Sequence, residues 1–171
     1  MVELLTKAFE ALKTLPPEDR ERIAYEILER VEDKSEWDRI ISSPAAQDWL
    51  AAEAKKALKG YDKVRKNLSM GFMNIEHDNL MRKSAYWAHF DDLPADVRQL
   101  AENNYQLWKK NTNHPGLRFK QIHKTLPIFS FRVGMRHRTV GVEADNGKIA
   151  WFWIGSFEHF RKAVGGVDTT K

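Results

Sequence analysis

The sequence PIFSFRVGMRHRTVGVEADNGKIAWFWIG, from Pro127 to Gly155, contains three short segments with the pattern of β-strands. Apolar and polar residues alternate over residues 129–133 and resume a strand pattern over 139–143, and residues 149–154 are apolar almost throughout. The Asp-Asn-Gly sequence at 145–147 predicts a tight hairpin turn, because Asn-Gly supplies the positive φ angles of a two-residue loop. The stretch therefore predicts an antiparallel meander of three strands.

Three arginines lie close together on this predicted meander: Arg132, Arg136 and Arg138. Arg132 and Arg138 would project from adjacent strands, where two guanidinium groups could bind a phosphate in the bidentate manner that lysine cannot copy. Lys120 and His123 lie on or just after a neighbouring predicted strand, and the sheet could bring them to the same face. Because histidine ordinarily titrates near neutral pH, His123 is the better candidate for proton transfer. The row of arginines predicts an anion-binding site, and carboxylate-paired surface arginines are the competing interpretation.

Charge is distributed unevenly along the 171 residues. Residues 1–54 contain 13 acidic and 7 basic side chains, a net charge of −6. Residues 55–71 contain 6 basic side chains and 1 acidic one, and residues 103–162 contain 11 basic and 3 acidic ones, so that these segments carry +5 and +8. Such asymmetry indicates either a nucleic-acid partner for the basic half or mutual neutralisation of the two halves.

Several classes of protein are excluded by composition. The chain has no cysteine, so a disulfide scaffold and a thiolate zinc site are ruled out. The six histidines have no carboxylates at ligand spacing, and we predict neither a metal site nor a cofactor. No apolar run approaches the roughly 20 residues that span a bilayer. We expect a soluble cytoplasmic protein that does not contact membranes.

The first 60 residues have the pattern of four short amphipathic helices. The double proline at 16 and 17 should end the first helix and open the second. Ser35 and Ser43-Pro44 indicate two further helix starts, and Gly60 indicates a helix end. Helices this short would be marginally stable alone and need a partner surface. The apolar stripe of the second helix consists of Ile23, Ala24, Ile27, Leu28 and Val31.

The second half of the chain is expected to segregate its helices from its strands. Residues 61–73 have no sustained periodicity and are interpreted as a linker. Helices are expected from Ile75 to Asp92 and from Leu93-Pro94 to Lys110, followed by a strand over 117–122, the meander, and a last helix capped by Ser156. Helices apart from a local antiparallel sheet predict an α+β domain.

A set of short motifs in this half resembles the RelE/ParE superfamily of bacterial toxins. In order, the motifs are Leu93-Pro94, Leu107-Trp108, His114-Pro115-Gly116-Leu117, Phe119-Lys120, Phe131-Arg132-Val133-Gly134, Arg138 and Trp151-Phe152-Trp153-Ile154-Gly155. The similarity covers about residues 74–164. Residues 1 to about 67, with Leu15-Pro16-Pro17-Glu18 and Trp37-Asp38, resemble the small helical antitoxins often encoded immediately upstream of such toxins.

The two resemblances imply a type II toxin–antitoxin pair on one chain. They imply an all-helical antitoxin-like segment over residues 1–60, a linker over 61–73 and a toxin domain over 74–171. That domain would contain two helices, a four-stranded antiparallel sheet and a C-terminal helix. The acidic helices would pack on the toxin domain and cover its basic face, within one chain or by domain swapping in a homodimer.

The family implies site residues as well. In RelE-like nucleases the corresponding strands carry basic residues that act on messenger RNA, and the matching positions here are Lys120, Arg132 and Arg138. Many relatives carry Arg or His and then Tyr after Trp-Ile-Gly, whereas this chain has Phe157 and Phe160, which cannot transfer protons. The candidate catalytic residues are Lys120, His123, Arg132, Arg138 and His159. The candidate RNA-binding residues are Arg118, Lys124, Arg136, His137 and Lys148.

Three functions remain open at this stage. The first is a metal-independent, ribosome-dependent endoribonuclease that the N-terminal helices hold inactive. The second is a ParE-like inhibitor of DNA gyrase, in which the same fold cuts nothing. The third is an inert, neutralised complex that regulates its own promoter, with the basic run Lys55–Lys66 available for operator DNA.

Overall fold

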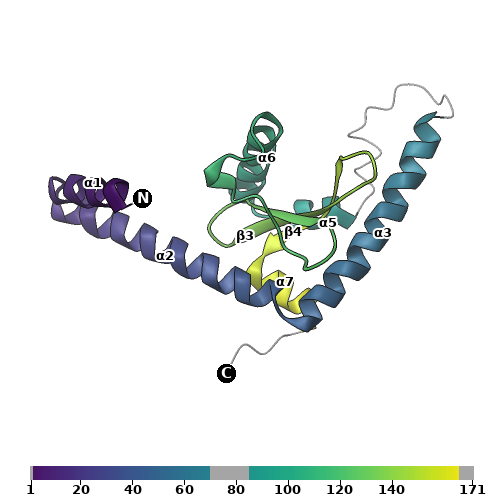
Figure 1. Cartoon of the computed structure of the whole chain (residues 1–171), viewed down its shortest axis with the longest axis horizontal. Coiled ribbons are helices and arrows are strands. Elements are labelled where there is room, and N and C mark those ends of the chain that lie inside the picture. Colours follow the sequence, from purple (N-terminus) through teal and green to yellow (C-terminus); the bar gives the residue numbers. More distant parts are fainter. Residues whose placement is uncertain (1, 70–84, 166–171) are drawn as a thin grey trace. The chain divides into compact units, whose positions relative to one another are not determined.

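The computed structural model describes residues 2–69 and 85–165, and its architecture is α+β (Figure 1). The N-terminal helical region, the four-stranded antiparallel sheet and the C-terminal helix are confirmed. The helices before the sheet are α1 (Val2–Lys13), α2 (Pro17–Ile41), α3 (Pro44–Ser69), α5 (Ala85–Asp91), α6 (Ala95–Lys110) and the 3-10 turn η1 (Pro115–Leu117). The sheet and the last helix are β1 (Lys120–Gln121), β2 (Ile128–Arg132), β3 (His137–Glu143), β4 (Ile149–Ser156) and α7 (Phe157–Ala163).

The chain forms two compact units, and the division between Glu36 and Trp37 falls inside α2. The first unit consists of α1 and the part of α2 up to Glu36, which we call the hairpin. Its two helices are separated at Pro16, as the double proline predicts, and α2 begins where the Arg20 N–H donates to the Pro16 carbonyl at 3.1 Å. None of the described side chains of the hairpin is buried.

Two of the expected helix boundaries are wrong. Helix α2 continues through residue 35 without a break, and α3, which begins at Pro44 as predicted, continues past Gly60 to Ser69. A glycine inside a helix costs only about 0.5–1 kcal/mol relative to alanine. The next residue, Tyr61, is buried, and its hydroxyl accepts a hydrogen bond from Asn146 Nδ2 at 2.9 Å, which offsets that cost. The expected linker is therefore helical over 61–69, and residues 70–73 lie outside the described residues, as do residues 75–84 of the next expected helix.

The strands are antiparallel in the order β1-β2-β3-β4. The predicted meander is confirmed, and its register sets Arg132 opposite Arg138. A β-bulge lies between Val140 and Gly141. A Cβ atom on Gly141 would lie 2.6 Å from the Trp151 ring, so only glycine allows this close approach of the indole.

The turn and the first strand differ from their predicted forms. Among residues 145–147 only Gly147 has a positive φ, at 75°, and the Ala144 N–H donates to the Lys148 carbonyl at 2.8 Å. This is a three-residue loop rather than the predicted two-residue turn, because one left-handed residue after an ordinary turn is enough to reverse the chain. The predicted strand over 117–122 is reduced to β1, since residues 115–117 form a 3-10 turn and Arg118 is left-handed, with φ 48°.

Each face of the sheet has its own hydrophobic core. On one face, the end of α2, α3 and α7 cover the sheet, and Figure 1 shows α7 (yellow) beside the strands. The largest fully buried side chains of this core are Trp37, Ile40, Leu50, Ile128, Val140, Trp153, Phe157 and Phe160. On the other face, α5, α6 and η1 pack on Phe131, Val133 and Ile154. None of the described helices combines the length and apolarity needed to cross a membrane.

Candidate functional site

Arg132 and Arg138 lie side by side on neighbouring strands, as the sequence predicts. They are register partners in β2 and β3, so their side chains project from the same face of the sheet. Both donate to one acceptor, the Gly134 carbonyl in the β2–β3 loop, with Arg132 Nε at 3.0 Å and Arg138 Nη1 at 3.3 Å. The shared carbonyl dipole holds the two positive groups together, and the loop after the Phe-Arg-Val-Gly motif therefore positions the pair.

Arg138 is covered by neighbouring side chains, and only 3% of it is exposed. Its Nη1 also donates to the His137 carbonyl at 2.9 Å. The guanidinium carbon lies 5.0 Å from the centre of the Phe157 ring and 5.8 Å from that of the Trp37 ring. Cation–π contacts and carbonyl dipoles together compensate for removing this charge from water. A phosphate could reach Arg138 only if Trp37 or Phe157 moved.

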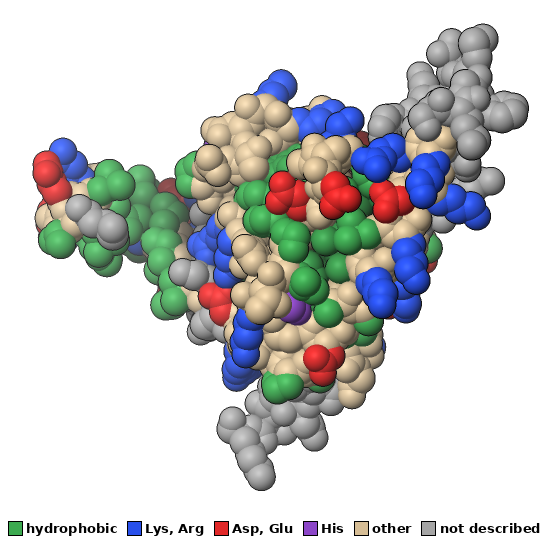
Figure 2. Space-filling view, turned by 45° about the vertical axis from the view of Figure 1, so that its right-hand side comes forward, with side chains coloured by type: hydrophobic (Ala, Val, Ile, Leu, Met, Phe, Trp, Pro, Cys, Tyr) green, Lys and Arg blue, Asp and Glu red, His purple; other side chains and the backbone are tan. Residues whose placement is uncertain are grey.

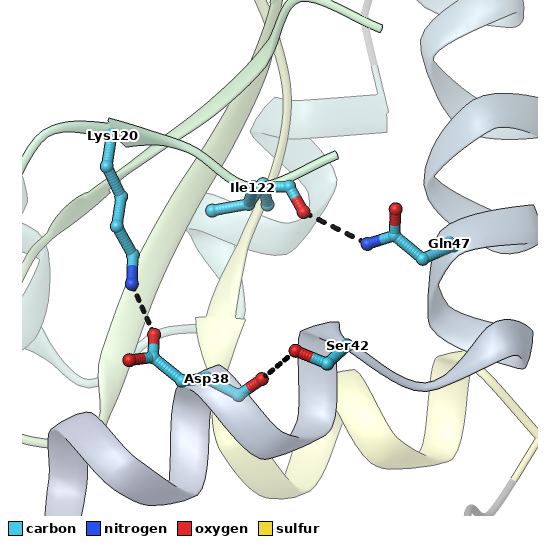
Figure 3. A network of polar contacts seen from close by, with 5 residues as sticks. All are labelled: Asp38, Ser42, Gln47, Lys120 and Ile122. Atoms are coloured by element: carbon cyan, nitrogen blue, oxygen red, sulfur yellow. Dashed lines mark hydrogen bonds and ion pairs between the residues drawn. The ribbon is translucent and has the colours of Figure 1, made fainter. Parts of the chain in front are cut away.

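Lys120 forms an ion pair with Asp38, the residue next to Trp37 in the last turns of α2 (Figure 3). The two side chains are 39% and 40% exposed, so the pair lies at the rim of the buried core. Asp38 also accepts a hydrogen bond through its backbone carbonyl from the Ser42 hydroxyl. The carboxylate that pairs with the candidate catalytic lysine therefore comes from the helix that also covers Arg138.

Gln47 joins α3 to the edge of the sheet, and sequence reasoning did not identify it. Its side chain is buried, and its Nε2 donates to the Ile41 carbonyl at 2.6 Å. The same Nε2 donates to the Ile122 carbonyl at 3.0 Å (Figure 3). Its Oε1 accepts from the backbone N–H of Lys124 at 3.0 Å. These three bonds fix the end of α2 and the chain after β1 to the start of α3.

His123 does not occupy the position of a proton donor on the sheet face. Its Nδ1 accepts from the backbone N–H groups of Thr125 and Leu126, at 3.2 and 3.0 Å. The imidazole therefore stabilises the β1–β2 turn, and protonation of Nδ1 would remove both bonds. The spacing of His123 from Lys120 in the sequence fits a catalytic role and a role in the turn equally well, so the sequence could not predict which of the two applies.

The remaining candidates lie in three places. Arg136, His137 and His159 lie near the start of β3 and the start of α7, where the Arg136 guanidinium carbon is 5.6 Å from the centre of the Phe157 ring. Lys148 directly precedes β4 at its opposite end, about 26 Å away for eight residues at 3.3 Å each. Arg118 and Lys124 flank β1. The predicted RNA-binding residues therefore do not form one continuous patch.

Burial lowers the pKa of His137 below its usual 6.5, and the positive field of His159, Arg138 and Arg136 lowers it further, against a smaller opposing effect of Asp96. Burial also lowers the pKa of His89, a residue of α5 whose ring centre lies 6.4 Å from that of Trp153. His89 was not predicted, because nothing in the sequence relates it to β3 or α7. Both imidazoles favour the neutral form, which can accept a proton.

Phe157 and Phe160, the two positions at which the chain departs from the pattern of the toxins that its motifs resemble, are fully buried. Trp37 stacks on Phe157 with ring centres 5.3 Å apart and meets Phe160 edge-on at 5.1 Å. These residues are core residues, so any proton transfer must come from neighbouring groups such as His159, which is exposed in the first turn of α7.

Across residues 2–69 and 85–165, no group of three or more His, Cys, Asp or Glu side chains is arranged to hold a metal ion. Comparison with protein-family models, curated proteins and solved structures finds no match to this chain.

Proposed function

We propose that this chain is a toxin–antitoxin pair on one polypeptide, in which the segment from Trp37 to Ser69 holds a RelE/ParE-like domain inactive. The order of elements from α5 to α7 supports the resemblance, since two helices, four antiparallel strands and a C-terminal helix follow one another as the motifs imply. The observation that carries the proposal is the cover over the basic residues. Trp37 lies against Arg138, and Asp38 pairs with Lys120.

The proposed activity of the uncovered domain is cleavage of messenger RNA on the ribosome. A base removes the proton of a 2′-hydroxyl, the 2′-oxygen attacks the phosphorus, and an acid protonates the leaving 5′-oxygen. Arg132, Arg138 and Lys120 would bind the phosphate and stabilise its added charge. His159 and His137, at the starts of α7 and β3, would exchange the protons.

Expression of residues 73–171 tests this proposal. The fragment should arrest growth, co-expression of residues 1–69 should relieve the arrest, and induced cells should contain messenger RNA cut at new ends. Arg132→Ala should abolish the arrest. Lys148→Ala, which removes a positive charge at the other end of β4, should preserve it.

A control for folding is needed, because the fragment lacks the helices that cover one face of its sheet. Soluble fragment with the near-ultraviolet circular dichroism of packed tryptophans, captured by residues 1–69, would show that it is folded. Folded fragment that leaves growth unchanged would contradict the proposal.

Inhibition of DNA gyrase is the second candidate, and the burial of Phe157 and Phe160 favours it. With both residues in the core, α7 supplies no aromatic hydroxyl or arginine at these positions for catalysis. In that case the fragment would arrest growth and induce a DNA-damage response without new RNA ends.

Binding of operator DNA is the third candidate, and the exposed basic side chains of α3 favour it. Two of these, Lys56 and Arg65, pair with acids of the same helix. The full set is Lys55, Lys56, Lys59, Lys63, Arg65 and Lys66. A salt-dependent shift of promoter DNA by the full chain would support this role, and no shift at low salt would count against it.

A further inference from the structure

The hairpin exposes an unusual amount of apolar surface for its size. Its seven exposed large apolar side chains are Val2 (80% exposed), Leu4 (76%), Leu5 (63%), Phe9 (58%), Ile27 (48%), Leu28 (59%) and Val31 (62%). At roughly 100 Å² for each side chain, they expose about 700 Å² in total, whereas the largest contiguous apolar patch on a typical monomer is about 300–600 Å². Figure 2 shows hydrophobic side chains over much of the visible surface of the hairpin, at the left.

The hairpin also has no buried core to stabilise it. None of its described side chains is buried, although α1 is strongly amphipathic, with Glu3, Lys7, Glu10 and Lys13 all on the side away from its apolar residues. Short helices obtain most of their stability from packing an apolar face, and two helices alone are marginal in water. The hairpin therefore needs a surface to cover its apolar face.

The charges of the hairpin indicate what kind of surface this is. On α1, Lys7 pairs with Glu3 at 3.2 Å and Lys13 pairs with Glu10 at 2.7 Å. On α2, Arg22 pairs with Asp19 at 3.0 Å. These pairs leave α1 neutral, whereas residues 17–36 keep a net charge of −4, from eight acidic and four basic side chains. An apolar partner would therefore contact the apolar stripes of the hairpin and not the acidic side of α2.

The second unit does not offer a comparable apolar face among its described residues. Its exposed large hydrophobic side chains are Leu100, Tyr105 and Leu126, which are 44%, 37% and 37% exposed and belong to α6 and the β1–β2 loop. Among the described surfaces, the one that matches the apolar face of a hairpin in size and character is the same face of another hairpin.

We infer that two copies of this chain associate through their α1–α2 hairpins, apolar face to apolar face, to form a four-helix bundle. Such an interface is two-fold symmetric, so each apolar side chain contributes twice. Two faces would bury about 1,400 Å², within the roughly 1,200–2,000 Å² of stable protein interfaces. Antiparallel helix pairs with wide apolar stripes are the usual components of such bundles. This inference does not depend on the proposed toxin–antitoxin function.

The test is the mass of the full chain in solution, by light scattering and by sedimentation over a range of concentrations. We expect twice the 19.9 kDa of one chain. The double variant Leu5→Glu, Phe9→Glu should be monomeric, because it would bury four charges at the interface. Leu126→Glu makes the same chemical change in the second unit and should leave the dimer intact. All six tryptophans lie in the second unit, so unchanged near-ultraviolet circular dichroism would show that this unit is still folded.

A second measurement locates the interface. Because the chain has no cysteine, Leu28→Cys introduces a single site for a spin label. A label at position 28 should report an inter-chain distance that disappears on dilution with unlabelled wild-type chain refolded together with it, and that is absent when Leu28→Cys is combined with Leu5→Glu, Phe9→Glu. A full chain that is monomeric at every concentration would overturn the inference, as would a dimer that the two glutamates leave unchanged.

Discussion

The hairpin and the segment from Trp37 to Tyr61 are both made of amphipathic helices, yet one is exposed and the other is buried. Trp37 is 2% exposed and Leu50 is fully buried, whereas Phe9 is 58% exposed and Leu28 is 59% exposed. Helical periodicity is clear in both regions, and it predicts which side of each helix is apolar. It does not predict what that side contacts. The sheet supplies a partner for the second region, and a second copy of the chain is our inferred partner for the first.

The largest expected difference between the regions is the cost of removing an aromatic side chain. Trp37→Ala should lower the free energy of unfolding by about 3–5 kcal/mol, as is typical for a large buried side chain. Phe9→Ala should change it by less than about 0.5 kcal/mol at concentrations where the chain is monomeric. Urea unfolding followed by far-ultraviolet circular dichroism measures the free energy of unfolding of both variants. Equal losses in the two variants would contradict the difference between the buried and the exposed region.

Trp37→Phe refines this prediction. The Trp37 Nε1 is buried and finds no hydrogen-bond acceptor among the described residues. Phenylalanine removes that uncompensated donor while it keeps a ring against Phe157, so the cost should be clearly smaller than that of Trp37→Ala. A cost as large as that of alanine would mean that the volume of the indole decides the effect.

The next effect concerns buried polar contacts. Gln47→Ala removes three hydrogen bonds and leaves backbone groups of Ile41, Ile122 and Lys124 without their partner, which should cost about 2–3 kcal/mol. The matched change in the hairpin is Thr14→Ala, which removes one exposed bond to the Ala11 carbonyl and should have little effect. Hydrogen exchange of the Lys124 amide should become faster in the Gln47 variant alone.

The contrast between local and distant contacts also explains how much could be predicted from the sequence. The sequence predicts the meander and the placement of Arg132 and Arg138 on neighbouring strands, because two strand patterns are separated by a short loop. The contacts of Lys120 with Asp38 and of Gln47 with Ile122 join residues 82 and 75 positions apart. No local pattern encodes such contacts, and the expectation that the acidic helices cover the arginines therefore rested on the charge asymmetry of the chain and on the family resemblance.

Two predictions from local sequence patterns were wrong because tertiary packing outweighed the local preference of the backbone. Gly60 has the chemistry of a helix end, yet the burial of Tyr61 keeps α3 helical to Ser69. The strand predicted over 117–122 alternates correctly, but Arg118 adopts a left-handed conformation and only Lys120 and Gln121 pair with β2. In both cases the sequence identifies residues of the right type, and packing decides the backbone.

The smallest expected difference is between two ion pairs. Asp38→Asn keeps the shape of the side chain and removes its charge, so the pair with Lys120 loses about 0.5–1 kcal/mol or less, given that both side chains are about 40% exposed. Glu10→Gln removes an exposed pair with Lys13 in the hairpin and should have no measurable effect. If the Asp38 pair matters, its contribution should shrink in high salt, because screening weakens exposed charges. A double-mutant cycle with Lys120→Met measures the pairwise energy, and a value that does not change between low and high salt would show that hydrogen bonding, rather than charge, holds α2 to β1.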